Sequence, residues 1–143
     1  MGVMANMRPD LFKGILAEVP WMDSLRASVR EVAPPYLLEN PEWGDLSDKK
    51  FFDYVRSYSP YHNLRAQGYP NLLVTTSFED SSVSYWSPAK WVAKLRATKT
   101  DSNRVLLKTA MEGGHGGASG RYARYSDTAF EYAFILDLAG IRQ

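Results

Sequence analysis

The chain has 143 residues, of which 45% are hydrophobic and 23% charged, as expected for one soluble globular domain. The formal net charge is +1, and no basic run points to nucleic acid or an anionic membrane as a partner. The absence of cysteine excludes disulfides and thiolate chemistry, and two histidines are too few for a histidine-rich metal site. We therefore expect no metal and no other cofactor. No stretch looks like a signal peptide or a membrane span, so we expect a cytoplasmic protein.

Hydrophobic patterning in the first half of the chain predicts one strand between helical segments. Residues 1–7 have helical potential, which Arg8-Pro9 ends. Gly14–Val19 predicts a short strand, and a partly helical connection and a proline-rich loop follow it. Ser47 is then expected to cap a helix that ends before Ser59-Pro60.

The second half of the chain predicts two further strands and two helices. Asn71–Thr76 is the clearest buried strand, and Pro88 begins a helix that runs to about Thr98. Arg104–Thr109 predicts the third strand, and Ser126 is expected to cap a last helix that ends at Gly140. The alternation predicts an α/β fold, with about three parallel strands flanked by helices in a single domain.

Two polar side chains follow the second and third predicted strands at similar distances. Asp80 lies four residues beyond Thr76, and His115 lies six beyond Thr109 in a glycine-rich loop. Adjacent parallel strands would bring both loops to the same edge of the sheet, where a carboxylate can accept the imidazole Nδ1 proton. The order of the acid before the histidine matches the second and third members of an α/β-hydrolase triad. The spacing fits equally an Asp80 that caps a turn and a solvated His115.

A serine nucleophile does not accompany these two residues. No Gly-x-Ser-x-Gly occurs in the sequence. Ser119 lies four residues after His115, but its Gly-Ala-Ser-Gly loop lacks the strand-to-helix elbow that exposes a nucleophile. We therefore expect Ser119 to make loop or capping contacts.

Long motifs in this sequence resemble the prolyl oligopeptidase family, most closely its oligopeptidase B branch. Tyr69–Arg96 resembles the family's acid region, and Gly113-Gly-His115-Gly-Gly-Ala-Ser-Gly-Arg121 resembles its histidine loop. Arg56-Ser-Tyr-Ser-Pro-Tyr-His-Asn63 and Glu131-Tyr-Ala-Phe134 match as well, so the resemblance covers nearly the whole chain.

The resemblance implies a serine peptidase that cleaves short peptides after Arg or Lys, with Asp80 and His115 as the triad acid and base. It also implies that residues 1–143 are a partial domain, the C-terminal segment of an α/β-hydrolase catalytic domain. The nucleophile elbow and the family's β-propeller lie outside it. The partner of the intact enzyme would then be an oligopeptide. The alternative is a non-catalytic truncated module that associates with another chain, and this polypeptide alone is predicted to be inactive.

The resemblance extends only in part to the pocket for a basic side chain. The branch carries glutamates before a Glu-Trp-Gly, and Glu39 matches the more distant of them, whereas Pro41 stands where a second is usual. A carboxylate at Glu39 could pair with a substrate guanidinium, and the alternative is a solvated side chain. His62 stands where the family commonly has an aspartate, and we assign it no role.

The expected strand order leaves Gly14–Val19 at an edge of the sheet. In the fold that the resemblance implies, the strand leading to the nucleophile lies beside it. Unpaired edges and uncovered apolar surface recruit partners. We therefore expect the chain to associate with a second copy or with the missing N-terminal half.

Overall fold

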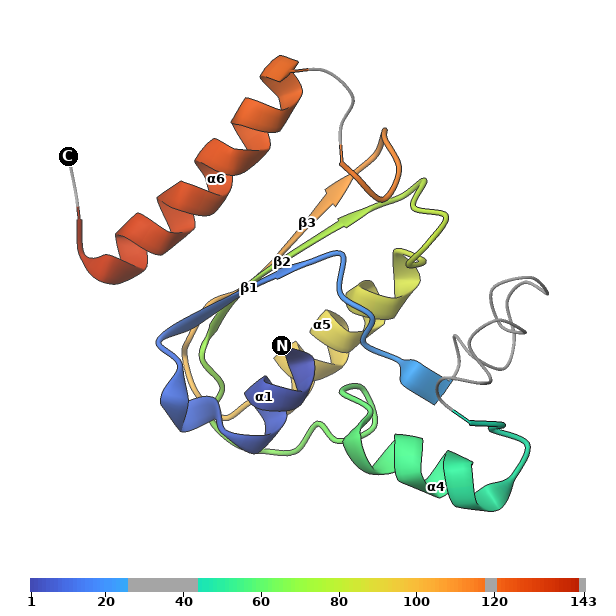
Figure 1. Ribbon diagram of the computed structural model, residues 1–143. Helices are drawn as coiled ribbons and strands as arrows, with labels where there is room; N and C mark the ends of the chain where they lie inside the picture. The colour runs from blue at the N-terminus through green and yellow to red at the C-terminus, as the bar shows by residue number, and fades with distance from the viewer. Residues whose placement is uncertain (26–43, 118–120, 142–143) are drawn as a thin grey trace.

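A three-stranded parallel sheet is the central element of the computed structural model, which describes residues 1–25, 44–117 and 121–141 (Figure 1). Its strands are β1 (Gly14–Glu18), β2 (Asn71–Ser77) and β3 (Val105–Ala110), and they lie in that order. Each predicted strand is present, with ends within one residue of those expected. Because the strands are parallel, the loops that follow them leave from the same edge of the sheet.

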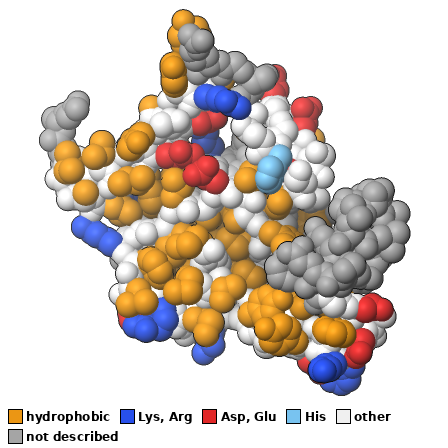
Figure 2. All heavy atoms as spheres, in the orientation of Figure 1, with side chains coloured by type: hydrophobic (Ala, Val, Ile, Leu, Met, Phe, Trp, Pro, Cys, Tyr) orange, Lys and Arg blue, Asp and Glu red, His pale blue; other side chains and the backbone are white. Residues whose placement is uncertain are grey.

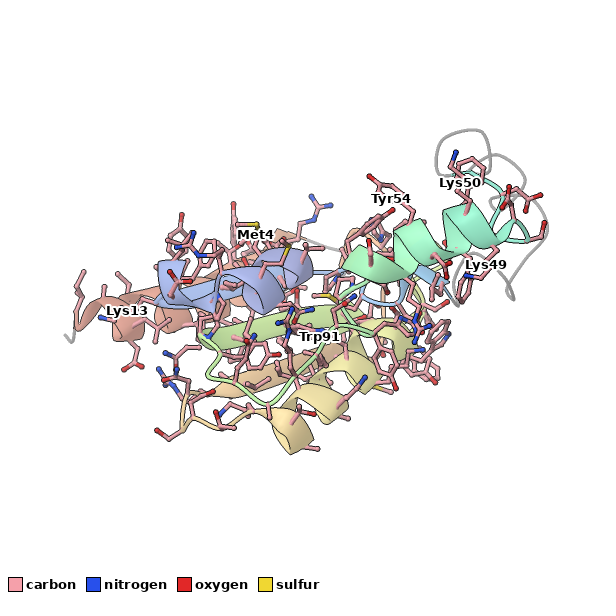
Figure 3. All side chains as sticks on the ribbon, turned by 90° about the horizontal axis from the view of Figure 1, so that it is seen from below. Met4, Lys13, Lys49, Lys50, Tyr54 and Trp91 are labelled. Atoms are coloured by element: carbon pink, nitrogen blue, oxygen red, sulfur yellow. The ribbon has the colours of Figure 1, made fainter. Side chains whose placement is uncertain are left out.

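One face of the sheet is covered by α1 (Gly2–Met7) and α5 (Trp86–Thr98). The 3₁₀ turn Pro9–Leu11 joins α1 to β1, and Trp91 is completely buried in the α5 layer, at the centre of Figure 3. The main core lies between these helices and the strands, and it contains Ala5, Ile15, Ala17, Met22, Tyr69, Leu72, Val74, Trp91, Val92, Leu95 and Val105.

The opposite face of the sheet carries one long helix, α6 (Arg121–Ala139), which lies on the other side of the strands from α1 and α5 and runs back in roughly the opposite direction to the strands (Figure 1). Phe134 is the one α6 side chain, among those described, that is buried. Leu138 packs against Gly14, where a β-carbon would displace the end of the Leu138 side chain. A shorter helix, α4 (Lys49–Tyr58), lies beside the sheet with Val55 in a second small core.

Three predicted helix starts are wrong. Helix α5 begins at Trp86, two residues before Pro88, with Tyr85 at the N-cap position. Asp48, and not Ser47, is the N-cap of α4, because its carboxylate accepts a hydrogen bond from the Lys50 amide at 2.8 Å. The last helix begins at Arg121, five residues before Ser126. The five residues before Ser126 are already helical. A capping residue marks the start of a helix only where the chain before it is not helical. The predicted end at Gly140 is confirmed, with φ at +77°.

Candidate functional site

The loops that follow β2 and β3 meet at the carboxyl edge of the sheet. The Phe78 amide continues the strand pairing by donating to the Ala110 carbonyl at 2.8 Å. The Ser77 hydroxyl then donates to the Gly113 carbonyl, which joins the start of one loop to the other. These contacts fix the two loops side by side before either reaches its candidate functional residue.

Asp80 is held from three directions in the first of these loops. Its side chain is fully buried, and Oδ1 accepts hydrogen bonds from the Ser82 and Val83 amides, both at 2.8 Å. Its other oxygen, Oδ2, lies 2.9 Å from His115 Nδ1. Burial acts to raise the pKa of Asp80, but the hydrogen bonds from Val83, His115 and Ser82 outweigh it, so the pKa lies below the ordinary aspartate value. The group is therefore a carboxylate at neutral pH.

His115 projects from a tight glycine turn in the second loop. The Gly117 amide donates to the Gly114 carbonyl at 3.0 Å, which closes the turn around the histidine. Gly113 and Gly117 have φ values of +90° and +79°, a region that side chains with a β-carbon rarely adopt. The His115 side chain is 48% exposed. An Nδ1 proton shared with Asp80 leaves Nε2 as the basic nitrogen of the neutral ring, on a side chain that solvent reaches.

A cavity of about 340 Å³ lies beside His115, between the ends of the strands and α6. Glu18 and Val19 at the end of β1 form one wall, and Asp127 and Glu131 of α6 form another. Val19 has a φ of +37°, which is unusual for a β-branched residue and marks the sharp exit of the chain from β1. The site is thus an open hollow with one buried carboxylate and one accessible imidazole at its edge.

The structure brings Asp80 and His115 together as the sequence predicted, and it leaves two other candidates untested. Glu39 and Ser119 lie outside the described residues. His62, to which we assigned no role, lies with its Nδ1 3.0 Å from the Ser59 hydroxyl and 3.9 Å from Asp23 Oδ1. Within the described part of the chain, no group of three or more potential ligands could hold a metal ion. No helix there is long and apolar enough to cross a membrane.

A buried polar network between the chain after β1 and helix α5 was not anticipated from the sequence. Asp23 is only 2% exposed and forms an ion pair with Lys90 of α5. The amides of Met22 and Asp23 both donate to the Ser87 hydroxyl, at 3.2 and 3.1 Å. This network ties the chain after β1 to the first turn of α5, immediately after the Asp80 loop. The only sequence signal for this network was Asp23 itself, a carboxylate that follows the apolar residues Trp21 and Met22.

The family model of the prolyl oligopeptidase family matches residues 1–142. This chain belongs to the prolyl oligopeptidase family. Its curated relatives include Protease 2 of Moraxella lacunata, 45% identical over 141 residues, and Dipeptidyl aminopeptidase BI of Pseudoxanthomonas mexicana, 43% identical over 141 residues. Each match covers 99% of this chain and 20% of the relative, so the chain spans about a fifth of their length.

Solved structures of oligopeptidase B share this fold closely. Oligopeptidase B from Leishmania major is 44% identical with a TM-score of 0.94, and the match covers 100% of this chain and 20% of that one. Oligopeptidase B from Trypanosoma brucei, in a form with covalently bound antipain, is 47% identical with a TM-score of 0.93, covering 99% and 20%. The three parallel strands and their helices are therefore part of the α/β-hydrolase fold of these peptidases.

Proposed function

We propose that this chain supplies the acid–base half of a serine peptidase catalytic centre that acts on oligopeptides. The observation that carries the proposal is the contact between the buried Asp80 carboxylate and the half-exposed His115 imidazole, 2.9 Å apart at the carboxyl edge of a parallel sheet. This is the arrangement by which a carboxylate fixes the tautomer of a catalytic histidine. Family membership supports a serine peptidase in which these residues would act.

In the proposed reaction, a serine from outside this sequence attacks the peptide carbonyl. His115 Nε2 takes the serine proton as the Oγ–C bond forms, and it then gives that proton to the leaving amine as the C–N bond breaks. Asp80 stays ionised, orients the ring through Nδ1 and stabilises the imidazolium. Water then hydrolyses the acyl-enzyme with His115 as the base again. The cavity beside His115 gives the serine-bearing segment and the substrate room to approach.

Cleavage after Arg or Lys is the finer part of this proposal, and Glu39 is its candidate determinant. A carboxylate that pairs with a substrate guanidinium would give such a preference. Two relatives that are almost equally identical to this chain are named Protease 2 and Dipeptidyl aminopeptidase BI. Overall sequence identity therefore does not indicate which peptidase specificity applies. A cytoplasmic location and an oligopeptide substrate likewise stay predictions.

The test of the proposal is a chimera in which this chain replaces the matched fifth of Trypanosoma brucei oligopeptidase B. We expect the chimera to hydrolyse an Arg-containing amide substrate. His115→Ala should lower kcat by several orders of magnitude, because members of a triad act as a unit. A folded chimera that keeps its activity with His115→Ala would contradict the assignment of the base. Glu39→Gln should raise KM for Arg substrates more than for neutral ones, and an equal rise for both would remove Glu39 from the pocket.

The isolated chain serves as the matched control, and it also tests the non-catalytic alternative. We expect no turnover from it, because its sequence contains no Gly-x-Ser-x-Gly nucleophile elbow and family membership implies that the oxyanion-hole donors come from elsewhere in the intact enzyme. Turnover that His115→Ala abolishes would reveal a nucleophile within the chain, for which Ser119→Ala is the first variant to examine. A chimera that folds and never hydrolyses substrate would favour the non-catalytic module.

A further inference from the structure

Ser77, the last residue of β2, contacts both of the loops that form the candidate site. We call residues 78–85 the acid loop and residues 111–117 the histidine loop. The Ser77 carbonyl accepts a hydrogen bond from the Asp80 amide at 3.3 Å, and its hydroxyl donates to the Gly113 carbonyl. Ser77 is only 1% exposed, so both bonds lie away from bulk water. One buried serine is therefore bonded to the acid loop and to the histidine loop at once.

The bond to Gly113 acts close to the imidazole in the histidine loop. Gly113 lies two residues before His115 and has a φ of +90°. Because glycine adopts positive and negative φ about equally readily, the local sequence does not by itself select this conformation. The hydrogen bond from Ser77 orients the peptide group that leads into the turn closed by Gly114 and Gly117. The direction in which His115 leaves the sheet therefore depends on a contact with β2.

The two side-chain contacts between the loops lie close together along the chain. Ser77 is three residues before Asp80, and Gly113 is two residues before His115, so only a few residues separate the Ser77–Gly113 contact from the Asp80–His115 contact. Once one contact has formed, the other closes a much shorter loop and costs less conformational entropy. Contacts that share short segments in this way are energetically coupled. Loss of the Ser77 hydroxyl should therefore weaken the contact between the carboxylate and the imidazole.

The imidazole depends on such support because half of it lies in water. The His115 side chain is 48% exposed, whereas the Asp80 side chain is fully buried. Figure 2 shows a histidine side chain at the surface of the molecule. A neutral imidazole can carry its proton on either nitrogen, and the hydrogen bonds around the ring decide which tautomer forms. A backbone held by Ser77 keeps Nδ1 directed at the carboxylate and so favours one tautomer.

Ser87 allows positioning to be distinguished from the simple satisfaction of a buried polar group. It too is 1% exposed, and its hydroxyl accepts hydrogen bonds from the Met22 and Asp23 amides. Both serines thus bind backbone groups in the interior, but the amides bound by Ser87 belong to the chain after β1 and to neither loop. If the Ser77 hydroxyl merely satisfied a buried carbonyl, the loss of either hydroxyl would have the same effect on His115.

We propose that Ser77 is a positioning residue, whose hydroxyl holds the histidine loop so that His115 keeps its Nδ1 proton directed at Asp80. The geometric part of this inference concerns the isolated chain and can be measured there. Its consequence for hydrolysis rests on the proposed function. The two parts are therefore tested by separate measurements.

The first measurement is nitrogen-15 NMR of the imidazole rings in the isolated chain at pH 8. Ser77→Ala should lower the ratio of the Nδ1-protonated to the Nε2-protonated tautomer of His115 by about threefold or more, which is the low end of the coupling between groups in contact. Ser77→Thr keeps a hydroxyl and should restore the ratio, and Ser87→Ala should leave it unchanged. The His62 ring, 3.0 Å from the Ser59 hydroxyl, is an internal reference that should not change.

Far-ultraviolet circular dichroism establishes which variants are folded. An unchanged His115 tautomer ratio in folded Ser77→Ala would overturn the proposal, and so would an equal change in Ser87→Ala. If Ser77→Ala does not fold, Ser77→Cys fills the same space with a weaker donor and is compared with Ser77→Thr instead. The tautomer ratio should then be lower in the cysteine variant, and equal ratios would overturn the proposal.

The second measurement uses the chimera with Trypanosoma brucei oligopeptidase B and an Arg-containing amide substrate. Ser77→Ala should lower kcat by about tenfold or more, because small displacements of reacting groups are costly, while KM changes less than about twofold. Ser77→Thr should recover most of kcat, and Ser87→Ala should stay within about twofold of the unmodified chimera. A lower kcat without a changed tautomer ratio would overturn the positioning role. An inactive chimera would contradict only the proposed function, since the NMR comparison still decides whether Ser77 positions His115.

Discussion

The helices on the two faces of the sheet differ strongly in how many of their side chains they bury. On one face, α5 buries Ser87, Pro88, Trp91, Val92 and Leu95 in 13 residues. On the other, α6 has 19 residues and buries Phe134 alone among its described side chains. Both helices follow a strand of the parallel sheet and lie against one of its faces, so their place in the topology is equivalent. The difference shows that a helix can be positioned by topology while its contribution to a core depends on what covers its far side.

Two exposed ion pairs join α6 to the strand β3 and to the residue before it. Arg104 pairs with Asp137 at 2.5 Å and Lys108 pairs with Asp127 at 2.6 Å, and all four side chains are more than a third exposed. Exposed ion pairs contribute little, about 0–1 kcal/mol each. The α5 face, in contrast, gains its stability from apolar area removed from water. The α5 side should therefore be the more stable half of this isolated chain.

The largest effect is expected from Trp91→Ala on the α5 face. This side chain is completely buried, so its loss should reduce the free energy of unfolding by about 3–5 kcal/mol. The matched change on the α6 face, Tyr132→Ala, should cost less than about 0.5 kcal/mol, because Tyr132 is 60% exposed. The free energy of unfolding of both variants is measured by urea denaturation monitored by far-ultraviolet circular dichroism, a signal that does not depend on Trp91. Similar losses for the two variants would mean that α6 is packed as fully as α5.

Much of the fold and the central pair of the site could be predicted from sequence because the relevant signals are local. The apolar runs Asn71–Thr76 and Arg104–Thr109 indicate strands, and fixed offsets from their ends place Asp80 and His115 at one edge. Parallel pairing of the two strands then brings the residues into contact. The start of α6 was missed because Ser126 is a good capping residue in a segment that is already helical.

Features made by distant residues could not be predicted in this way. Asp23 meets Lys90 and Ser87, which are more than 60 residues away along the chain, and no spacing rule connects them. The same holds for the incomplete covering of α6. Its residue pattern predicts a helix, but the local pattern does not specify whether its exposed tyrosines and Leu136 are covered by surrounding polypeptide.

Asp80→Asn is expected to have a smaller effect on stability. It alters the contact with His115 that joins the loop before α5 to the loop before α6. Losing the charge-assisted bonds should cost about 1.5–3 kcal/mol at neutral pH. Because the folded pKa of Asp80 lies below its ordinary value of 3.8, the stabilisation is present above that pH. It is lost as the pH falls below 3.8 and through the lower folded value.

The measurement is the free energy of unfolding of both proteins between pH 7 and pH 2. The difference in the free energy of unfolding between wild type and Asp80→Asn should become smaller as the pH falls. Nitrogen-15 NMR of His115 should also show a changed tautomer, because an amide NH₂ group would face Nδ1. A difference in unfolding free energy that stays constant with pH, or an unchanged His115 tautomer, would mean that Asp80 does not orient His115.

The smallest effect is expected from Glu131→Gln, on the α6 face of the cavity. Burial, together with the carboxylates of Glu18 and Asp127, raises the pKa of Glu131 above its ordinary value of 4.5, although Lys108 opposes the shift. Because the folded pKa is raised, stability falls as the pH rises from 4.5 through the folded value, and the penalty is complete at neutral pH. Glutamine carries no charge, so the variant should be more stable by about 0.5 kcal/mol at pH 7 and equal to wild type below about pH 4. A double-mutant cycle with Glu18→Gln locates the cause: the two changes should be less than additive, since each removes the same repulsion. A gain that persists at acid pH, or strict additivity, would show that Glu131 and Glu18 do not repel each other across the cavity.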